Sequence, residues 1–201
     1  MPSDTDAMKD RLTTNTATKH LLVLEAARDL FLKQGFAEVA MDEIARKAGI
    51  SKRTVYQMCG NRNRLIAATV THDFEAWNEW FFDAVREQAK TGAAMLDAFH
   101  EVLGQCVESP GFHGCLFARV MLSPDLADNT VRDAATACAV RLYTFFYDHI
   151  RKTSAPDTGA AARLQTVYLV LLLLGGATRR TSGDLGKQLA RDARTFLELL
   201  S

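Results

Sequence analysis

Apolar residues along the chain recur at intervals of three and four, the spacing that places them on one face of a helix. The clearest case runs from Thr18 to Gln34 and ends at Gly35. Alternation of apolar and polar residues, the pattern of a half-buried strand, is nearly absent. Only four prolines and twelve glycines interrupt the 201 residues. The pattern therefore predicts an all-α protein.

The same periodicity divides the chain into about nine helices. They are expected at residues 18–34, 41–48, 52–59, 62–90, 93–108, 115–122, 125–152, 161–180 and 184–200. Residues 1–17 precede the first apolar face and are expected to form a flexible N-terminal arm.

A tight turn separates the second and third predicted helices. Gly49 closes the second helix, and Ser51 is a good N-cap for the third, "KRTVYQMC". Two short helices joined by about three residues, with a glycine at the bend, are typical of a helix-turn-helix, whose second helix enters the major groove of DNA. We therefore predict a three-helix DNA-binding domain at residues 18–65 and a second helical domain at residues 66–201.

Charge is unevenly distributed although the formal net charge is zero. Residues 1–65 carry 11 Lys and Arg against 8 Asp and Glu, and residues 66–201 carry 13 against 16. From Ile44 to Leu65 there are six basic residues and no acidic one. Such a run can be a solvated face, but here it coincides with the candidate recognition helix and favours a polyanionic partner.

One stretch carries a family resemblance. "AARDLFLKQGFAEVAMDEIARKAGISKRTVYQMCGNRNRLIAATV" resembles the TetR/AcrR family of bacterial transcriptional regulators, through an apolar helix ending in "GF" followed by "xEIAxxAGISKxTVYxxxxxxxxL". "PGFHGCLF" looks like a Gly-Cys pattern found in the ligand-binding domain of some members. The resemblance implies a homodimeric repressor on a palindromic double-stranded DNA operator, released when its C-terminal domain binds a small effector.

The resemblance and the side-chain chemistry together give the candidate DNA contacts. These are six polar or basic residues on or beside the third helix: Lys52, Arg53, Thr54, Tyr56, Gln57 and Arg62. Arg53 and Gln57 are candidates for reading bases, because Arg prefers guanine O6/N7 and Gln prefers adenine N6/N7. The resemblance assigns the other four to phosphates, which fix the register of the protein on the duplex.

The chain departs from the family pattern at three places. Ala40 stands where a Thr or Ser often caps the second helix and contacts phosphate. Met58 and Cys59 replace an aromatic or His and a Phe, and are expected to turn inward. Asn63 or Arg64 replaces a usual acidic residue, which makes the surface more basic. These departures leave open an alternative: a helical effector-binding or interaction protein with weakened DNA binding.

The second predicted domain has two further candidate surfaces. A pocket for a small apolar or aromatic effector is expected among Trp77, Phe81, Phe99, His100, Cys106, Phe117, Met121, Tyr143 and Phe146. The same residues can equally form packed core. The last two helices have apolar faces suited to a four-helix dimer interface, with Leu164, Tyr168, Leu171, Leu189 and Phe196 as its candidates, although part of these faces can be subunit core.

Other classes of function find little support in the sequence. Four widely spaced cysteines without a CxxC favour reduced thiols in a cytoplasmic protein. The longest apolar run, residues 167–177, is too short to span a bilayer. His100, Cys106, His113 and Cys115 fit no zinc spacing, so neither a metal nor another cofactor is expected. With no GxSxG, P-loop or GxGxxG, the chain is not expected to be an enzyme.

Overall fold

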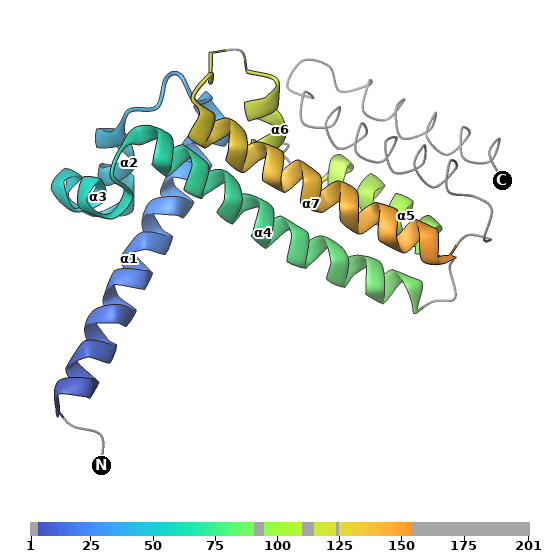
Figure 1. The fold of residues 1–201 in the computed structure, drawn as a ribbon, viewed down its shortest axis with the longest axis horizontal. Helices are drawn as coiled ribbons and strands as arrows, with labels where there is room; N and C mark the ends of the chain where they lie inside the picture. The colour runs from blue at the N-terminus through green and yellow to red at the C-terminus, as the bar shows by residue number, and fades with distance from the viewer. Residues whose placement is uncertain (1–3, 91–94, 110–114, 124, 154–201) are drawn as a thin grey trace.

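The computed structural model describes residues 4–90, 95–109, 115–123 and 125–153. These residues form seven α-helices and no strand (Figure 1). The helices are α1 (Asp4–Gln34), α2 (Met41–Ala48), α3 (Lys52–Cys59), α4 (Arg62–Ala89), α5 (Met95–Glu108), α6 (Leu116–Met121) and α7 (Asn129–Thr153). The all-α prediction is confirmed over this part of the chain. The helices predicted at 161–180 and 184–200 lie outside the described residues.

α1 begins much earlier than predicted. Residues 4–17, expected to be a flexible arm, continue the helix that was predicted to start at Thr18. The segment has no Pro or Gly to stop a helix, and residues 15–19 are exposed. The lack of apolar periodicity in this segment therefore did not indicate a lack of helical structure. Figure 1 shows this end of α1 projecting away from the other helices.

The turn between α2 and α3 forms as the sequence predicts. Gly49 adopts a left-handed conformation with φ 68°, which a residue with a side chain adopts at a cost. Ile50 N–H then donates to the Ala45 carbonyl at 3.0 Å, which closes the turn. The Ser51 side chain caps α3 by accepting from Thr54 N–H at 3.2 Å. These contacts fix the direction in which α3 leaves α2.

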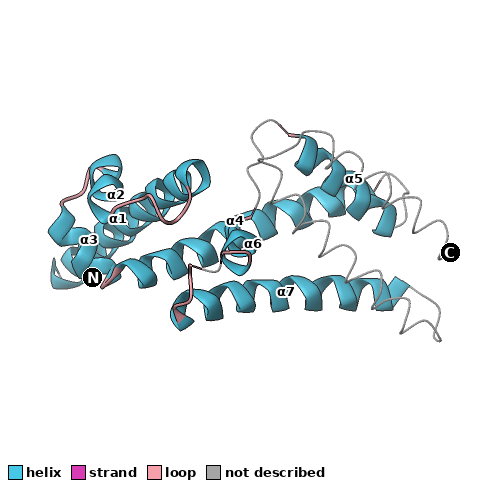
Figure 2. Ribbon diagram, turned by 90° about the horizontal axis from the view of Figure 1, so that it is seen from above, coloured by secondary structure: helices cyan, strands magenta, loops and turns pink. Residues whose placement is uncertain are grey.

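α4 is the element shared by the two halves of the structure. It packs against α1 and α3 of one half and against α5, α6 and α7 of the other. In Figure 2, α1, α2 and α3 gather at one end of α4, while α5 and α7 run along its length on opposite sides. No helix within the described ranges is both long and apolar enough to cross a membrane.

The core around α4 is largely aromatic. Phe81 packs against Phe99 and Phe146 at ring-centroid distances of 6.0 and 6.1 Å, and all three side chains are fully buried. Phe74 meets Phe117 edge to face at 5.6 Å, which joins α4 to α6. Edge-to-face pairs add to the stability that burial provides. The core is therefore continuous from α1 through α4 to α7.

Candidate nucleic-acid interface

One face of α3 presents polar side chains to solvent. Val55 and Cys59 face the core, so the four residues Lys52, Arg53, Tyr56 and Gln57 are left exposed together. Thr54 is half-buried, and its hydroxyl lies 2.8 Å from that of Ser51 at the start of the helix. A short capped helix with such a face has the shape and chemistry to enter a major groove.

Lys52 is already paired in this structure. Its Nζ lies 2.6 Å from Oδ1 of Asp42 in the first turn of α2. The same Nζ lies 6.0 Å from the ring centroid of Tyr56. The hydrogen bond and charge of Asp42 raise the pKa of Lys52 above its ordinary value, so the ammonium is fully charged at neutral pH.

Arg62 occupies a different place from the exposed four. Its guanidinium donates to the backbone carbonyl of Phe36, in the loop that follows α1, and its side chain is half-buried. Arg62 therefore ties α4 to the loop before α2. Arg64, which the sequence did not single out as a contact, is exposed instead. A Cβ at Gly60 would lie 3.3 Å from Cδ and Nη1 of Arg64, so this cation lies beside the end of α3.

The departures from the family pattern have visible structural consequences. Ala40 occupies the N-cap of α2 and supplies no side-chain cap. Cys59 is buried and Met58 is half-buried against the core, so both turn inward as predicted. Asn63 at the start of α4 hydrogen-bonds Asp128, next to the start of α7, and this contact lowers the pKa of Asp128.

The predicted effector residues do not all gather in one place. Trp77, Phe81, Phe99 and Phe146 form one aromatic cluster. Phe117 packs on Phe74 instead, Tyr143 stacks on Tyr147, and the 44% exposed Met121 lies at the surface. The side chain of His100 lies outside the described part of the structure. Because the Phe81, Phe99 and Phe146 side chains are fully buried, they serve as core in this conformation.

Trp77 is the unusual member of the aromatic cluster. Its indole Nε1 is buried and has no hydrogen-bond acceptor of good geometry among the described residues. The Cys106 thiol lies near enough to interact with this N–H. Burial raises the pKa of Cys106, and the interaction with Trp77 lowers it in part. A buried donor without an acceptor of good geometry is costly.

The cysteines behave as buried thiols. Burial raises the pKa of Cys59, Cys106 and Cys115, and raises that of Cys138 to about 11. The basic neighbours of Cys59 therefore do not activate it, because a protonated thiol is a poor nucleophile. No group of three or more metal-binding side chains occurs within the described ranges, and His113 lies outside them.

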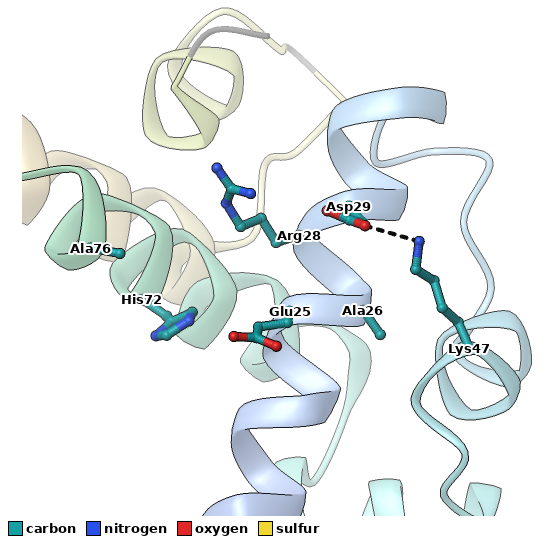
Figure 3. Close-up of a pocket in the computed structure, with 7 residues that line it drawn as sticks. All are labelled: Glu25, Ala26, Arg28, Asp29, Lys47, His72 and Ala76. Atoms are coloured by element: carbon teal, nitrogen blue, oxygen red, sulfur yellow. Dashed lines mark hydrogen bonds and ion pairs between the residues drawn. The ribbon is translucent and has the colours of Figure 1, made fainter. Parts of the chain in front are cut away.

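A surface groove of about 420 Å³ lies between α1, α2 and α4 (Figure 3). Its lining residues are Glu25, Ala26, Arg28, Asp29, Lys47, His72 and Ala76. Lys47 is paired with Asp29 at 3.1 Å, and Arg28 is paired with Asp73. The lining of the groove also includes the acidic residues Glu25 and Asp29, whereas α3 carries no acidic residue, so the groove is a weaker candidate than α3 for binding a polyanion.

The helix-turn-helix region is similar to known sequences. Residues 23–69 match the family described as bacterial regulatory proteins, tetR family. The HTH-type transcriptional regulator AlkX of Mycobacterium tuberculosis is 39% identical over 67 residues, which are 32% of this chain and 32% of AlkX. The uncharacterized HTH-type transcriptional regulator YdeS of Bacillus subtilis is 43% identical over 47 residues, which are 23% of this chain and 24% of YdeS. The match thus spans a third or less of these curated relatives.

Solved structures share the fold over most of the chain. A TetR-family transcriptional regulator from Agrobacterium tumefaciens has a TM-score of 0.69 at 15% identity, covering 91% of this chain and 97% of its own. Reduced NemR of E. coli has a TM-score of 0.66 at 14% identity, covering 88% and 97%.

The arrangement defines a class of protein: a helix-turn-helix carried at one end of a helical body. Residues 23–69 match the tetR family of bacterial regulatory proteins, and most of the chain resembles TetR-family structures in its fold.

Proposed function

We propose that this chain is a sequence-specific DNA-binding transcriptional regulator that inserts α3 into the major groove. The observation that carries the proposal is the exposed face of α3, where Lys52, Arg53, Tyr56 and Gln57 stand together on a helix capped by Ser51. Arg53 and Gln57 read bases, and Lys52, Thr54 and Tyr56 contact phosphates. Arg64 joins the phosphate contacts, while Arg62 acts mainly through the loop that it holds.

Each of the two predicted domains has its own role in this proposal. Residues 18–65 bind DNA, and residues 66–201 bind effector and form a homodimer in the cytoplasm. Two α3 helices then meet half-sites whose centres lie about 34–36 Å apart, or a multiple of this distance, on a palindromic operator. The proposed dimer residues Leu164, Tyr168, Leu171, Leu189 and Phe196 lie outside the described residues, so this part rests on their sequence pattern.

The effector is a small apolar or aromatic molecule with a hydrogen-bond acceptor. It enters beside Trp77, displaces part of the aromatic packing and accepts from the indole N–H, which has no acceptor of good geometry among the described residues. α6 carries the change to the DNA-binding end. Leu116 N–H at its start donates to Asp73, and Arg119 donates to the carbonyl of Leu32 on α1 at 2.8 Å. Effector binding shifts the population away from the DNA-binding arrangement, so the protein represses until effector arrives.

Titration with DNA tests the proposed function. The DNA flanking the chain's own gene and a random-sequence duplex are compared by fluorescence anisotropy between about 50 and 200 mM salt. We expect tighter binding to one site in the flanking DNA, and Arg53→Ala should change which base variants of that site are preferred. Arg86→Ala is the matched control, because it removes the same charge from the last turn of α4, at the end away from α3.

One alternative has a specific observation in its favour. α2 lacks the side-chain cap that also supplies a phosphate contact in relatives, because Ala40 stands there. A helical effector-binding or interaction protein with weakened DNA binding fits this feature. Equal affinity of the wild type for the flanking DNA and the random duplex would favour this alternative.

A further inference from the structure

On the proposed DNA-facing surface, the acidic side chain of Asp42 contacts Lys52, which we propose to bind a DNA phosphate. Asp42 projects from the first turn of α2, and its Oδ1 lies 2.6 Å from Nζ of Lys52 on α3. Both side chains are exposed, at 63% and 57% respectively. Residues 44–72, which include all of α3, contain no acidic residue. A carboxylate here opposes the binding of a polyanion, so its presence needs an explanation.

The pair keeps the Lys52 ammonium in a defined place. Asp42 holds it from the α2 side, and the Tyr56 ring lies 6.0 Å away on the α3 side. A DNA phosphate that binds Lys52 has to replace Asp42 or share the ammonium with it. An exposed ion pair is weak, so a well-placed phosphate can displace the carboxylate, whereas a distant or hydrated one cannot.

We propose that Asp42 acts as an internal competitor for Lys52 and so determines specificity: Lys52 stays with Asp42 on nonspecific DNA and transfers to a phosphate when α3 is seated on its operator. This inference rests on the proposed function of α3. Nonspecific affinity comes from phosphate contacts alone, whereas the operator adds base contacts that fix the depth of the helix. Withholding one cation therefore weakens nonspecific binding more than operator binding.

Neighbouring acids have other partners, which separates their roles from that of Asp42. Glu43, the next residue in the same turn, accepts from Nε2 of Gln34 at 2.9 Å. Asp29 pairs with Lys47 at 3.1 Å. Glu43→Gln thus removes the same charge from the same helix end without freeing Lys52, and it reproduces any loss of the favourable helix-dipole interaction.

A double-mutant cycle tests the competition. Wild type, Asp42→Asn, Lys52→Ala, the double variant and Glu43→Gln are titrated with the random-sequence duplex and with the fragment that the wild type prefers. Asp42→Asn should tighten binding to the random duplex roughly two- to fivefold. It should also steepen the dependence of log affinity on log salt by about 0.9, the value for one added phosphate contact. The gain on the preferred fragment should be smaller.

Variants that lack Lys52 show whether Asp42→Asn changes DNA affinity by freeing Lys52. In that background Asp42→Asn should have little effect, and Glu43→Gln should be close to wild type throughout. An equal gain with and without Lys52 would mean that Asp42 merely repels DNA, which overturns the proposal. Equal gains on both DNAs, no gain, or a loss of affinity would overturn it as well. If the wild type binds no fragment more tightly than the random duplex, both the proposed function and this proposal fail. If the wild type discriminates and Asp42→Asn discriminates equally well, only this proposal fails.

Discussion

The guanidinium of Arg28 on α1 lies 2.5 Å from the carboxylate of Asp73 on α4, and the other oxygen of that carboxylate accepts from Leu116 N–H at 3.2 Å. Asp73 thereby joins α1 to the start of α6. Its side chain is 7% exposed, while that of Arg28 is 44% exposed. The carboxylate is thus the member of the pair with little access to compensating water.

Loss of the Asp73 carboxylate should destabilise the protein. Asp73→Ala leaves Leu116 N–H buried without its acceptor, and we expect a loss of about 1–3 kcal/mol in the free energy of unfolding in urea. Arg28 is exposed enough to be rehydrated and adds little to that cost. Asp73→Asn keeps an acceptor and should lose less. Asp83→Asn, which removes an exposed partner of Arg86, is the control and should stay near wild type. Equal stability of Asp73→Ala and wild type would contradict this role.

Arg62 and Arg64 should separate into a structural and a DNA-contacting residue. Arg62→Ala frees the Phe36 carbonyl and should lower stability by about 1 kcal/mol. Arg64→Ala should leave stability near wild type and reduce the slope of log affinity against log salt by about 0.9. Urea unfolding and DNA titration of both variants give the comparison. The reverse assignment would restore Arg62 as the main phosphate ligand at the start of α4.

The ends of α2 and α3 agree residue for residue with their predicted bounds, because the signals for them are local. Gly49 and Gly60 end the two helices, and Ser51 starts the second of them. The start of α1 could not be found in this way. A pattern of apolar residues reports burial, and the first turns of α1 project away from the other helices (Figure 1).

The shared exposed face of Lys52, Arg53, Tyr56 and Gln57 could be predicted because one helix carries all four residues. The position of the Arg62 side chain could not, since it depends on a carbonyl 26 residues away in the sequence. The same limit applies to the predicted pocket. Both Phe117 and Trp77 fit an apolar pocket by residue type, but the fold puts Phe117 against Phe74, and it buries the Trp77 N–H without an acceptor of good geometry among the described residues.

The two glycines Gly49 and Gly104 should respond oppositely to alanine. Gly49 has φ 68°, so Gly49→Ala forces a side chain into the left-handed region and should cost about 1–2 kcal/mol. Gly104 lies inside α5, and no atom of the described residues lies within 4 Å of the position that a Cβ would take there, so Gly104→Ala should stabilise the protein by roughly 0.5–1 kcal/mol. Thermal unfolding of both variants distinguishes these effects. A stabilising Gly49→Ala would argue against the tight turn.

Adding a cap to α2 should strengthen both the fold and DNA binding. Ala40 has extended backbone angles, φ −89° and ψ 151°, which suit an N-cap Ser. Ala40→Ser should therefore add about 0.5–1 kcal/mol of stability, and its hydroxyl can also reach a phosphate. Ala40→Gly is the control, because it provides no side-chain acceptor. Urea unfolding and DNA titration are the measurements, and a Ser variant no better than Gly in either would contradict the expectation.

The buried thiols should make stability fall at alkaline pH. The pKa of Cys138 is raised to about 11 in the folded protein, whereas a thiol in the unfolded chain ionises near 9. The unfolded state therefore loses its proton first. The stabilisation is fully present below pH ~9 and is lost as the pH rises through about 11. Cys138→Ala should lower stability at neutral pH, because it leaves a cavity, but should flatten the decline between these values. Urea unfolding at several pH values measures both, and an unchanged pH profile in Cys138→Ala would show that other groups cause the decline.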